Sequence, residues 1–211
     1  KSSAASDVYK RQHENRHQDA ARTKIFSRKF PSFEWQNLGR KRGELLFLSG
    51  NDIDMKTKIN KTNAVRLLDK AKIDYELIPY EVDENDLAAA HVAAQLEENI
   101  EQVFKTLVLH GDRGGYFVCV IPGDHELDLK VAAKASGNKK ADLIPMKELL
   151  PITGYIRGGC SPIGMKKEFP TFIHESCLKF EYIYISAGVR GLQIRLNPKD
   201  LITYTRATLI S

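Results

Sequence analysis

A glycine-rich stretch that holds two candidate nucleophiles is the part of the sequence closest to chemistry. Residues 153–167 read TGYIRGGCSPIGMKK and include the neighbours Cys160 and Ser161. Either nucleophile would need a nearby base to remove its proton. None of the six histidines forms a recognisable signature with Cys160, and Ser161 lacks the GxSxG elbow of serine hydrolases. We therefore interpret Cys160 as a space-filling thiol and Ser161, which precedes Pro162, as a turn residue.

The glycines of the same stretch offer a different kind of site. Gly158, Gly159 and Gly164 permit positive φ angles and a close approach of the backbone to another molecule. A loop of this kind exposes N–H and C=O groups that can hold a ligand. Spacing alone leaves two interpretations equally open, a ligand cradle and an ordinary tight loop.

Two further segments carry isolated positive charges among apolar or small residues. Lys105 lies in VFKTLVLHG, where its ammonium group can bind a carbonyl or phosphate oxygen or stabilise an oxyanion. The alternative is a lysine that extends its charge into solvent. The segment SAGVRG, 186–191, combines two glycines with Arg190 and suits either a phosphate or ribose contact or a hairpin turn. The lysine pairs at 139–140 and 166–167 are typical of a solvated surface.

These residues require a set of short helices and strands to position them. Apolar residues at helical spacing, with caps such as Thr62 and Asn197, predict helices at 63–72, from Asp86 to about Leu96, and at 127–136, 145–154 and 197–205. Runs rich in β-branched and aromatic residues predict strands at 75–80, 104–111, 114–123, 155–159, 171–175, 181–186 and 192–196. Because strands and helices do not alternate regularly, we expect an α+β domain. Its sheet is predicted to be mixed and strongly curved, barrel-like, with about six or seven strands and the short helices packed around it.

Charge divides the chain unevenly. The sequence carries a net charge of +5, of which +4 falls in residues 1–54 and +1 in residues 55–211. Residues 1–54 show no sustained period and open with SSAASDVYKRQ, which resembles a translated adapter tail. We expect 1–54 to be a disordered or non-native extension, the alternative being a basic nucleic-acid-binding arm. Met55 is then the expected start of the functional domain, 55–211.

Composition narrows the class of protein. No apolar run reaches the roughly 20 residues that span a bilayer, and the N-terminus shows no secretion signal. Three widely spaced cysteines and the absence of HExxH or zinc spacing predict free thiols, a cytoplasmic location, and neither a metal nor a cofactor. No membrane or DNA partner is expected.

Six segments, taken in order, resemble the YbaK family of aminoacyl-tRNA editing proteins, which is related to the editing domain of bacterial prolyl-tRNA synthetases. The resemblance covers about residues 56–211 and rests on KTNAVRLLDKAKI (61–73), YEVDE (80–84), VFKTLV (103–108), LDLKVAAKASGNKK (127–140), TGYIRGGCSPIGMKK (153–167) and YISAGVRGLQI (184–194). It implies hydrolysis of the ester that joins a wrong amino acid to tRNA. Thr106 after the key lysine and the GGCSP element both favour the branch that removes cysteine from tRNA(Pro) over the branch that removes alanine.

The same resemblance implies which residues form the site. Lys105 would hold the terminal phosphate or the ester carbonyl, and the backbone at Gly158 and Gly159 would contact the aminoacyl group and the ribose. The resemblance places substrate contacts at Tyr80, Thr106 and Ser186. Arg190 of the SAGVRG segment is predicted as a further substrate contact from its residue type and setting. Some relatives carry aspartate where this chain has Gln193, which leaves the role of that position open.

No protein base is needed if the substrate supplies its own nucleophile. An aminoacyl ester is activated, so positioning and oxyanion stabilisation can suffice. The resemblance suggests that the thiol of a cysteinyl ester attacks its own carbonyl. Expected partners are mischarged tRNA(Pro) and, as a candidate, prolyl-tRNA synthetase. A deacylase for another mischarged tRNA and a non-catalytic module that binds tRNA or the synthetase are the alternatives.

Overall fold

The computed structural model describes residues 61–83, 89–96 and 98–211. All of them belong to one compact unit, Asn60–Ser211. The predicted extension 1–54, the start at Met55 and the predicted helix cap Asp86 lie outside the described residues.

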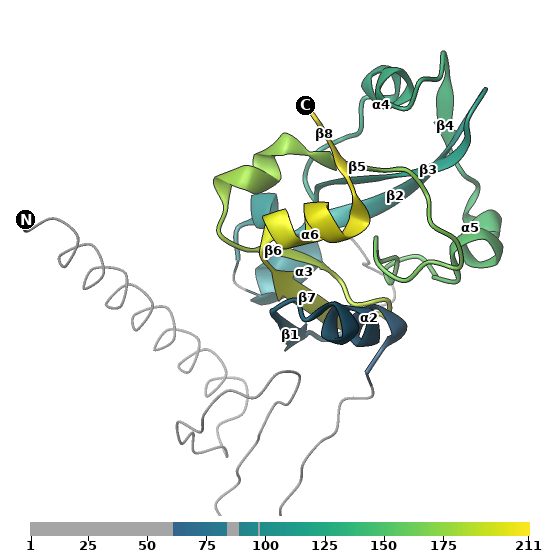
Figure 1. Ribbon diagram of the computed structural model, residues 1–211. Helices are drawn as coiled ribbons and strands as arrows, with labels where there is room; N and C mark the ends of the chain where they lie inside the picture. The colour runs from purple at the N-terminus through teal and green to yellow at the C-terminus, as the bar shows by residue number, and fades with distance from the viewer. Residues whose placement is uncertain (1–60, 84–88, 97) are drawn as a thin grey trace, which may run out of the picture. The chain divides into compact units, whose positions relative to one another are not determined.

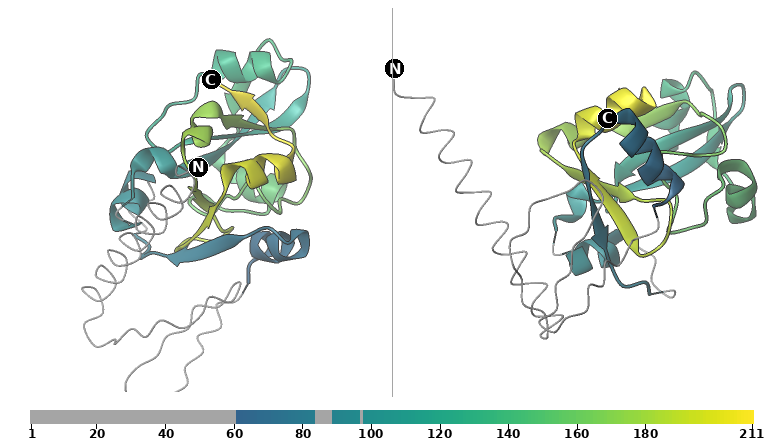
Figure 2. Two further views of the ribbon diagram at one scale, coloured as in Figure 1. Left: turned by 60° about the vertical axis from the view of Figure 1, so that its left-hand side comes forward. Right: turned by 60° about the horizontal axis from the view of Figure 1, so that its bottom comes forward.

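Short helices, some of them capped by side chains, surround the strands (Figures 1 and 2). The described residues form α2 (Asn63–Ala71), α3 (Ala89–Leu96), α4 (Leu129–Ala135), α5 (Met146–Thr153) and α6 (Pro198–Thr205), with 3₁₀ turns η1 (Ile100–Gln102) and η2 (Glu175–Lys179). Oγ1 of Thr62 accepts a hydrogen bond from the backbone N–H of Val65, and Asn197 caps α6 in the same way through Lys199. The helices predicted around Thr62 and Asn197 are thus confirmed.

The described strands form two sheets. The smaller is antiparallel, with the order β1-β7-β6, and contains β1 (Tyr75–Pro79), β6 (Ile183–Ser186) and β7 (Leu192–Leu196). The larger has the order β4-β2-β3-β5-β8 and contains β2 (Phe104–Gly111), β3 (Gly115–Pro122), β4 (Ala141–Leu143), β5 (Thr171–His174) and β8 (Thr208–Ile210). It is mixed, because β4, β2 and β3 pair antiparallel whereas β3, β5 and β8 pair parallel.

The prediction of one strongly curved, barrel-like sheet is wrong. The two sheets are separate and open, with β1 and β6 at the edges of one and β4 and β8 at the edges of the other. An isolated parallel bridge between Val103 and Tyr184 joins them. A barrel requires its edge strands to pair with each other, and sequence pattern identifies strands without identifying their partners. The α+β class and the mixed pairing were predicted correctly.

The predicted strand 155–159 is also wrong. These residues form a loop in which Gly158 has φ of +80°, outside the range of a strand. Two strands of three residues each, β4 and β8, escaped prediction because so short a run shows no alternation.

Among the described residues, two clusters of buried side chains hold these elements together. The first packs α4 against β2, β3 and β5, and the rings of Phe117 and Phe172 meet edge to face at 5.7 Å. The second joins α3 to the bridge between the sheets through Val92, Val103 and Tyr184. The junction of the two sheets is therefore packed from one side by α3.

Candidate functional site

A cavity of about 490 Å³ lies where the two sheets meet, and we call it the central cavity. Its walls come from both sheets, from α3 and α5, and from the loop after α5. Five of the seven predicted site residues line it, namely Tyr80, Lys105, Thr106, Gly158 and Ser186. Four segments that are far apart in the sequence thus meet at one cavity.

Lys105 is held in place by a backbone carbonyl. Its Nζ donates a hydrogen bond to the oxygen of Gly123 at 3.0 Å, and both residues line the central cavity. Burial lowers the pKa of Lys105, while the negative charges of Asp124 and Glu126 oppose that shift. An ammonium group has three N–H donors, so this contact leaves two for a ligand.

Two buried polar atoms beside Lys105 lack a hydrogen-bond partner among the described residues. They are Oγ1 of Thr106 and Oε1 of Gln193, and both residues line the central cavity. A buried polar atom left unpaired costs about 1–3 kcal/mol, so native proteins seldom keep one without a reason. Each atom is therefore a candidate for a hydrogen bond to a bound polar group.

Strand pairing brings Gln193 and Ser186 together. They are directly opposite each other in the antiparallel pair β6–β7, so their side chains share one face of the sheet. Oγ of Ser186 accepts a hydrogen bond from the N–H of Gly188 at 3.2 Å. The hydroxyl hydrogen of Ser186 is the group that this contact leaves for a ligand.

Gly159 packs against the turn between β6 and β7. A Cβ atom at Gly159 would lie 3.2 Å from the carbonyl carbon of Val189, so only glycine fits without a shift of backbone. Nε of Arg190 donates to the carbonyl oxygen of Arg157 at 2.9 Å. Gly159 and Arg190 are not among the lining residues. They hold the loop that presents Gly158 to the cavity.

The start of α2 braces the same two loops. Oγ1 of Thr62 donates to the carbonyl oxygen of Ala187 at 2.6 Å, and Nδ2 of Asn63 donates to the carbonyl oxygen of Gly164 at 3.0 Å. The hydroxyl of Tyr155 donates to the carbonyl oxygen of Ile163 at 2.6 Å. The backbone that surrounds the cavity is therefore held by side chains from outside it.

Neither candidate nucleophile is poised to react. Cys160 lines the cavity but is 8% exposed, and burial raises the pKa of its thiol to about 12. A thiol with this pKa holds almost no thiolate at neutral pH. Ser161 is fully buried, and its Oγ accepts from the N–H of Ile163 within a turn. These observations support the interpretation of Cys160 as a space-filler and of Ser161 as a turn residue.

Sequence reasoning missed some lining residues. Arg157 and Asp83 both line the cavity and are exposed. Arg157 directly precedes the glycine pair 158–159, and this position could have identified it as a lining residue. Among the described residues, no histidine lines the central cavity and no group of three or more His, Cys, Asp or Glu side chains could hold a metal ion. None of the described helices has both the length and the apolar character needed to cross a membrane.

Comparisons with known proteins bear on this geometry. The sequence matches the model of the aminoacyl-tRNA editing domain over residues 83–204. A protein of Enterococcus faecalis, EbsC, named as a candidate Cys-tRNA(Pro)/Cys-tRNA(Cys) deacylase, is 48% identical over 145 residues, which are 69% of this chain and 88% of EbsC.

Two solved structures share the fold. The hypothetical protein APE2540 is 22% identical with a TM-score of 0.65, over 70% of this chain and 97% of that chain. A candidate trans-editing enzyme for prolyl-tRNA synthetase is 22% identical with a TM-score of 0.60, over 69% of this chain and 89% of that chain.

Proposed function

The chain belongs to the aminoacyl-tRNA editing domain family, and we propose that it hydrolyses the ester of Cys-tRNA(Pro), releasing cysteine and tRNA(Pro). The observation that carries the proposal is the composition of the central cavity. Its described lining combines an oriented ammonium group, a glycine backbone and two polar atoms without a hydrogen-bond partner there, and the thiol of Cys160 has a pKa of about 12. Such a cavity can bind and polarise an ester without supplying a nucleophile of its own.

Each cavity group has a part in this reaction. Lys105 binds the ester carbonyl or the phosphate of the terminal adenosine and stabilises the negative charge that develops there. The N–H and C=O groups of the loop at Gly158 contact the aminoacyl group and the ribose, and Tyr80 forms a wall. Ser186, Thr106 and Gln193 supply hydrogen-bonding atoms for the hydroxyl and amino groups of the substrate.

The substrate's thiol is the proposed nucleophile. Its sulfur forms a bond to the ester carbonyl carbon, the carbon–oxygen ester bond breaks, and the thiol proton passes to the ribose oxygen. Water then opens the resulting thiolactone to give cysteine. The reaction involves neither oxidation nor reduction. The protein positions the substrate and stabilises the charge that develops on it.

The alternatives to this proposal differ in substrate or in class of protein. Hydrolysis of Ala-tRNA(Pro) is the alternative, since alanine is smaller than cysteine and a hydrophobic pocket excludes smaller side chains only weakly. A non-catalytic module that holds tRNA or docks on prolyl-tRNA synthetase is the alternative from another class. A cytoplasmic location and a synthetase partner stay predictions.

The experiment compares Cys-tRNA(Pro) and Ala-tRNA(Pro) as substrates, together with tRNA binding, for the wild-type chain and Lys105→Ala. We expect rapid loss of cysteine, slow loss of alanine, and a variant that binds tRNA but turns over poorly. If Ala-tRNA(Pro) is hydrolysed as fast as Cys-tRNA(Pro), the alternative activity, hydrolysis of Ala-tRNA(Pro), is favoured. Tight tRNA binding without turnover by the wild type would favour the binding module.

A further inference from the structure

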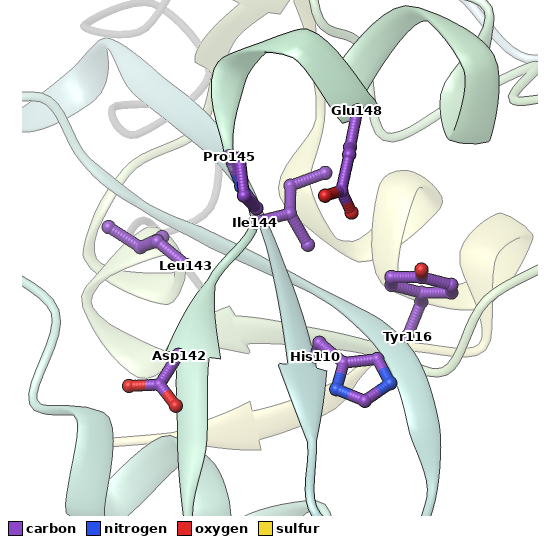
Figure 3. A pocket seen from close by; sticks show the side chains of 7 residues that line it. All are labelled: His110, Tyr116, Asp142, Leu143, Ile144, Pro145 and Glu148. Carbon is purple, nitrogen blue, oxygen red and sulfur yellow. The ribbon is translucent and has the colours of Figure 1, made fainter.

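A second hollow, of about 280 Å³, lies beside the central cavity, and we call it the Tyr116 hollow (Figure 3). Its floor is a row of three residues that are directly opposite one another across neighbouring strands: Tyr116 on β3, His110 on β2 and Asp142 on β4. Such residues share one face of the sheet. Glu148 of α5 lies across the hollow from this row, as Figure 3 shows.

The two hollows lie along the same strand face. Alternate residues of a strand point to the same side, so Thr106 in the central cavity and His110 in the Tyr116 hollow share one face of β2. They are four positions apart, which corresponds to about 13 Å along the strand. Leu143 and Ile144 line both hollows. A chain that ends in the central cavity therefore reaches the Tyr116 hollow within a short distance.

Charge and ring chemistry restrict what the Tyr116 hollow can hold. Among the described residues that line it there are two carboxylates, Asp142 and Glu148, and neither lysine nor arginine, so a phosphate is disfavoured. The ring of Tyr116 makes edge-on contacts with His110 at 4.9 Å and with Phe169 at 6.3 Å, which hold it in one orientation. An aromatic ring with nearby carboxylate acceptors suits a planar group that carries an amine.

We propose that the Tyr116 hollow binds a cytosine of the CCA end of the tRNA, upstream of the terminal adenosine. The inference rests on the proposed function, which puts the terminal adenosine and its amino acid in the central cavity. Cytosine stacks on aromatic rings, and its N4 amine donates to carboxylates. The volume of the hollow, about 280 Å³, is just below the range for pockets that bind drug-sized ligands, about 300–1,000 Å³, so the hollow suits a single base.

Binding, not turnover, tests this assignment directly. The probe is an uncharged RNA hairpin with the tRNA(Pro) acceptor stem and a CCA end, measured by anisotropy with the full chain. Tyr116→Ala is expected to raise the dissociation constant about tenfold, as loss of base stacking does, whereas Tyr116→Phe keeps the ring and stays near wild type. Tyr204→Ala, which removes a half-buried tyrosine outside both hollows, is the matched control.

Base identity provides the second test. Uracil presents an oxygen where cytosine presents the N4 amine. Hairpins that end in CUA or UCA replace one cytosine of the CCA end each, so they show which of the two cytosines binds in the hollow. One of them is expected to bind the wild type less tightly. That loss should disappear in the double variant Asp142→Asn, Glu148→Gln, because the carboxylates no longer face the oxygen. Equal affinity of all three hairpins for the wild type would overturn the cytosine assignment.

The experiments distinguish an error in the cytosine assignment from an error in the proposed function. Equal dissociation constants for wild type and Tyr116→Ala overturn the hollow assignment, even if Cys-tRNA(Pro) is rapidly hydrolysed. Preferential binding of a lysine-rich peptide in place of the hairpin would also overturn it and point to a protein partner. If the hairpin binds through Tyr116 but Cys-tRNA(Pro) survives, the hollow assignment stands and the deacylase function fails.

Discussion

Nζ of Lys105 lies 3.0 Å from the carbonyl oxygen of Gly123, at the wall of the central cavity. This contact ties the side chain of β2 to the end of the hairpin formed with β3. It holds the ammonium group in one direction before a substrate arrives. Preorganised charge of this kind is the largest single contribution in many enzymes, because no reorganisation is needed during the reaction.

Replacing Lys105 should therefore abolish most of the activity. We expect Lys105→Ala to lower kcat for Cys-tRNA(Pro) by about 10²–10³-fold, the loss seen when one charge-stabilising donor is removed. The exposed Lys139→Ala is the matched control and should keep its rate. Single-turnover kinetics measure both variants. A Lys105→Ala protein with wild-type kcat would contradict the role of this ammonium group.

The glycine pair should tolerate no side chain at its second position. In Gly159→Ala the new Cβ would lie 3.2 Å from backbone of Val189, which cannot rotate away as a side chain would. We expect a loss of about 1–3 kcal/mol in the free energy of unfolding, together with reduced turnover. Urea denaturation and deacylation kinetics measure the two effects.

Gly137→Ala is the control for this substitution. Gly137 has φ of +72° but open space around it, so alanine there adds only backbone strain of about 1–2 kcal/mol. Its turnover should match the wild type. Unchanged turnover in both variants would show that the loop at Gly158 does not need this packing.

The buried thiol should be dispensable for chemistry. Cys160→Ala is expected to keep turnover near the wild-type value, because a thiol with a pKa of about 12 supplies no thiolate at neutral pH. Alkylating reagents should likewise leave activity unchanged in the folded protein. Loss of turnover in Cys160→Ala without loss of stability would restore this residue as a nucleophile.

Removal of the Thr106 hydroxyl should have opposite effects on the stability of the fold and on substrate binding. Thr106→Val replaces a buried oxygen that has no hydrogen-bond partner among the residues that the structure describes. The free energy of unfolding should therefore rise by about 1 kcal/mol, while KM for Cys-tRNA(Pro) also rises. Thr171→Val is the contrast, since Oγ1 of Thr171 donates to the carbonyl oxygen of Phe169 at 3.0 Å. This second variant should lose about 1 kcal/mol and keep its KM. Thermal or urea unfolding beside steady-state kinetics would distinguish the two.

Much of the local structure was predictable because its causes are local. Thr62 and Asn197 cap helices through their own side chains, and the β2–β3 hairpin follows from two apolar runs around a polar turn. The predicted site residues came from motif resemblance, and five of them line one cavity. The packing of Gly159 on Val189 was not predictable, because it depends on a turn 30 residues away.

Strand partners and unpaired atoms depend on the complete fold. Nothing in the runs at 75–80 or 171–175 says that they belong to separate sheets, which is why the barrel-like prediction was wrong. In the same way, the sequence left the role of Gln193 open. The fold pairs it with Ser186, and its Oε1, in a residue that lines the cavity, has no hydrogen-bond partner in the described part of the chain.

The measurement that tests the central claim most directly is deacylation of Cys-tRNA(Pro) beside Ser-tRNA(Pro) by the wild-type chain. The two substrates differ by one atom, sulfur or oxygen, and the proposed reaction uses that atom as the nucleophile. The proposal predicts fast release of cysteine, and release of serine at the rate of the uncatalysed reaction. Equal turnover of both substrates would contradict attack by the substrate's thiol and would require a nucleophile from water or from the protein.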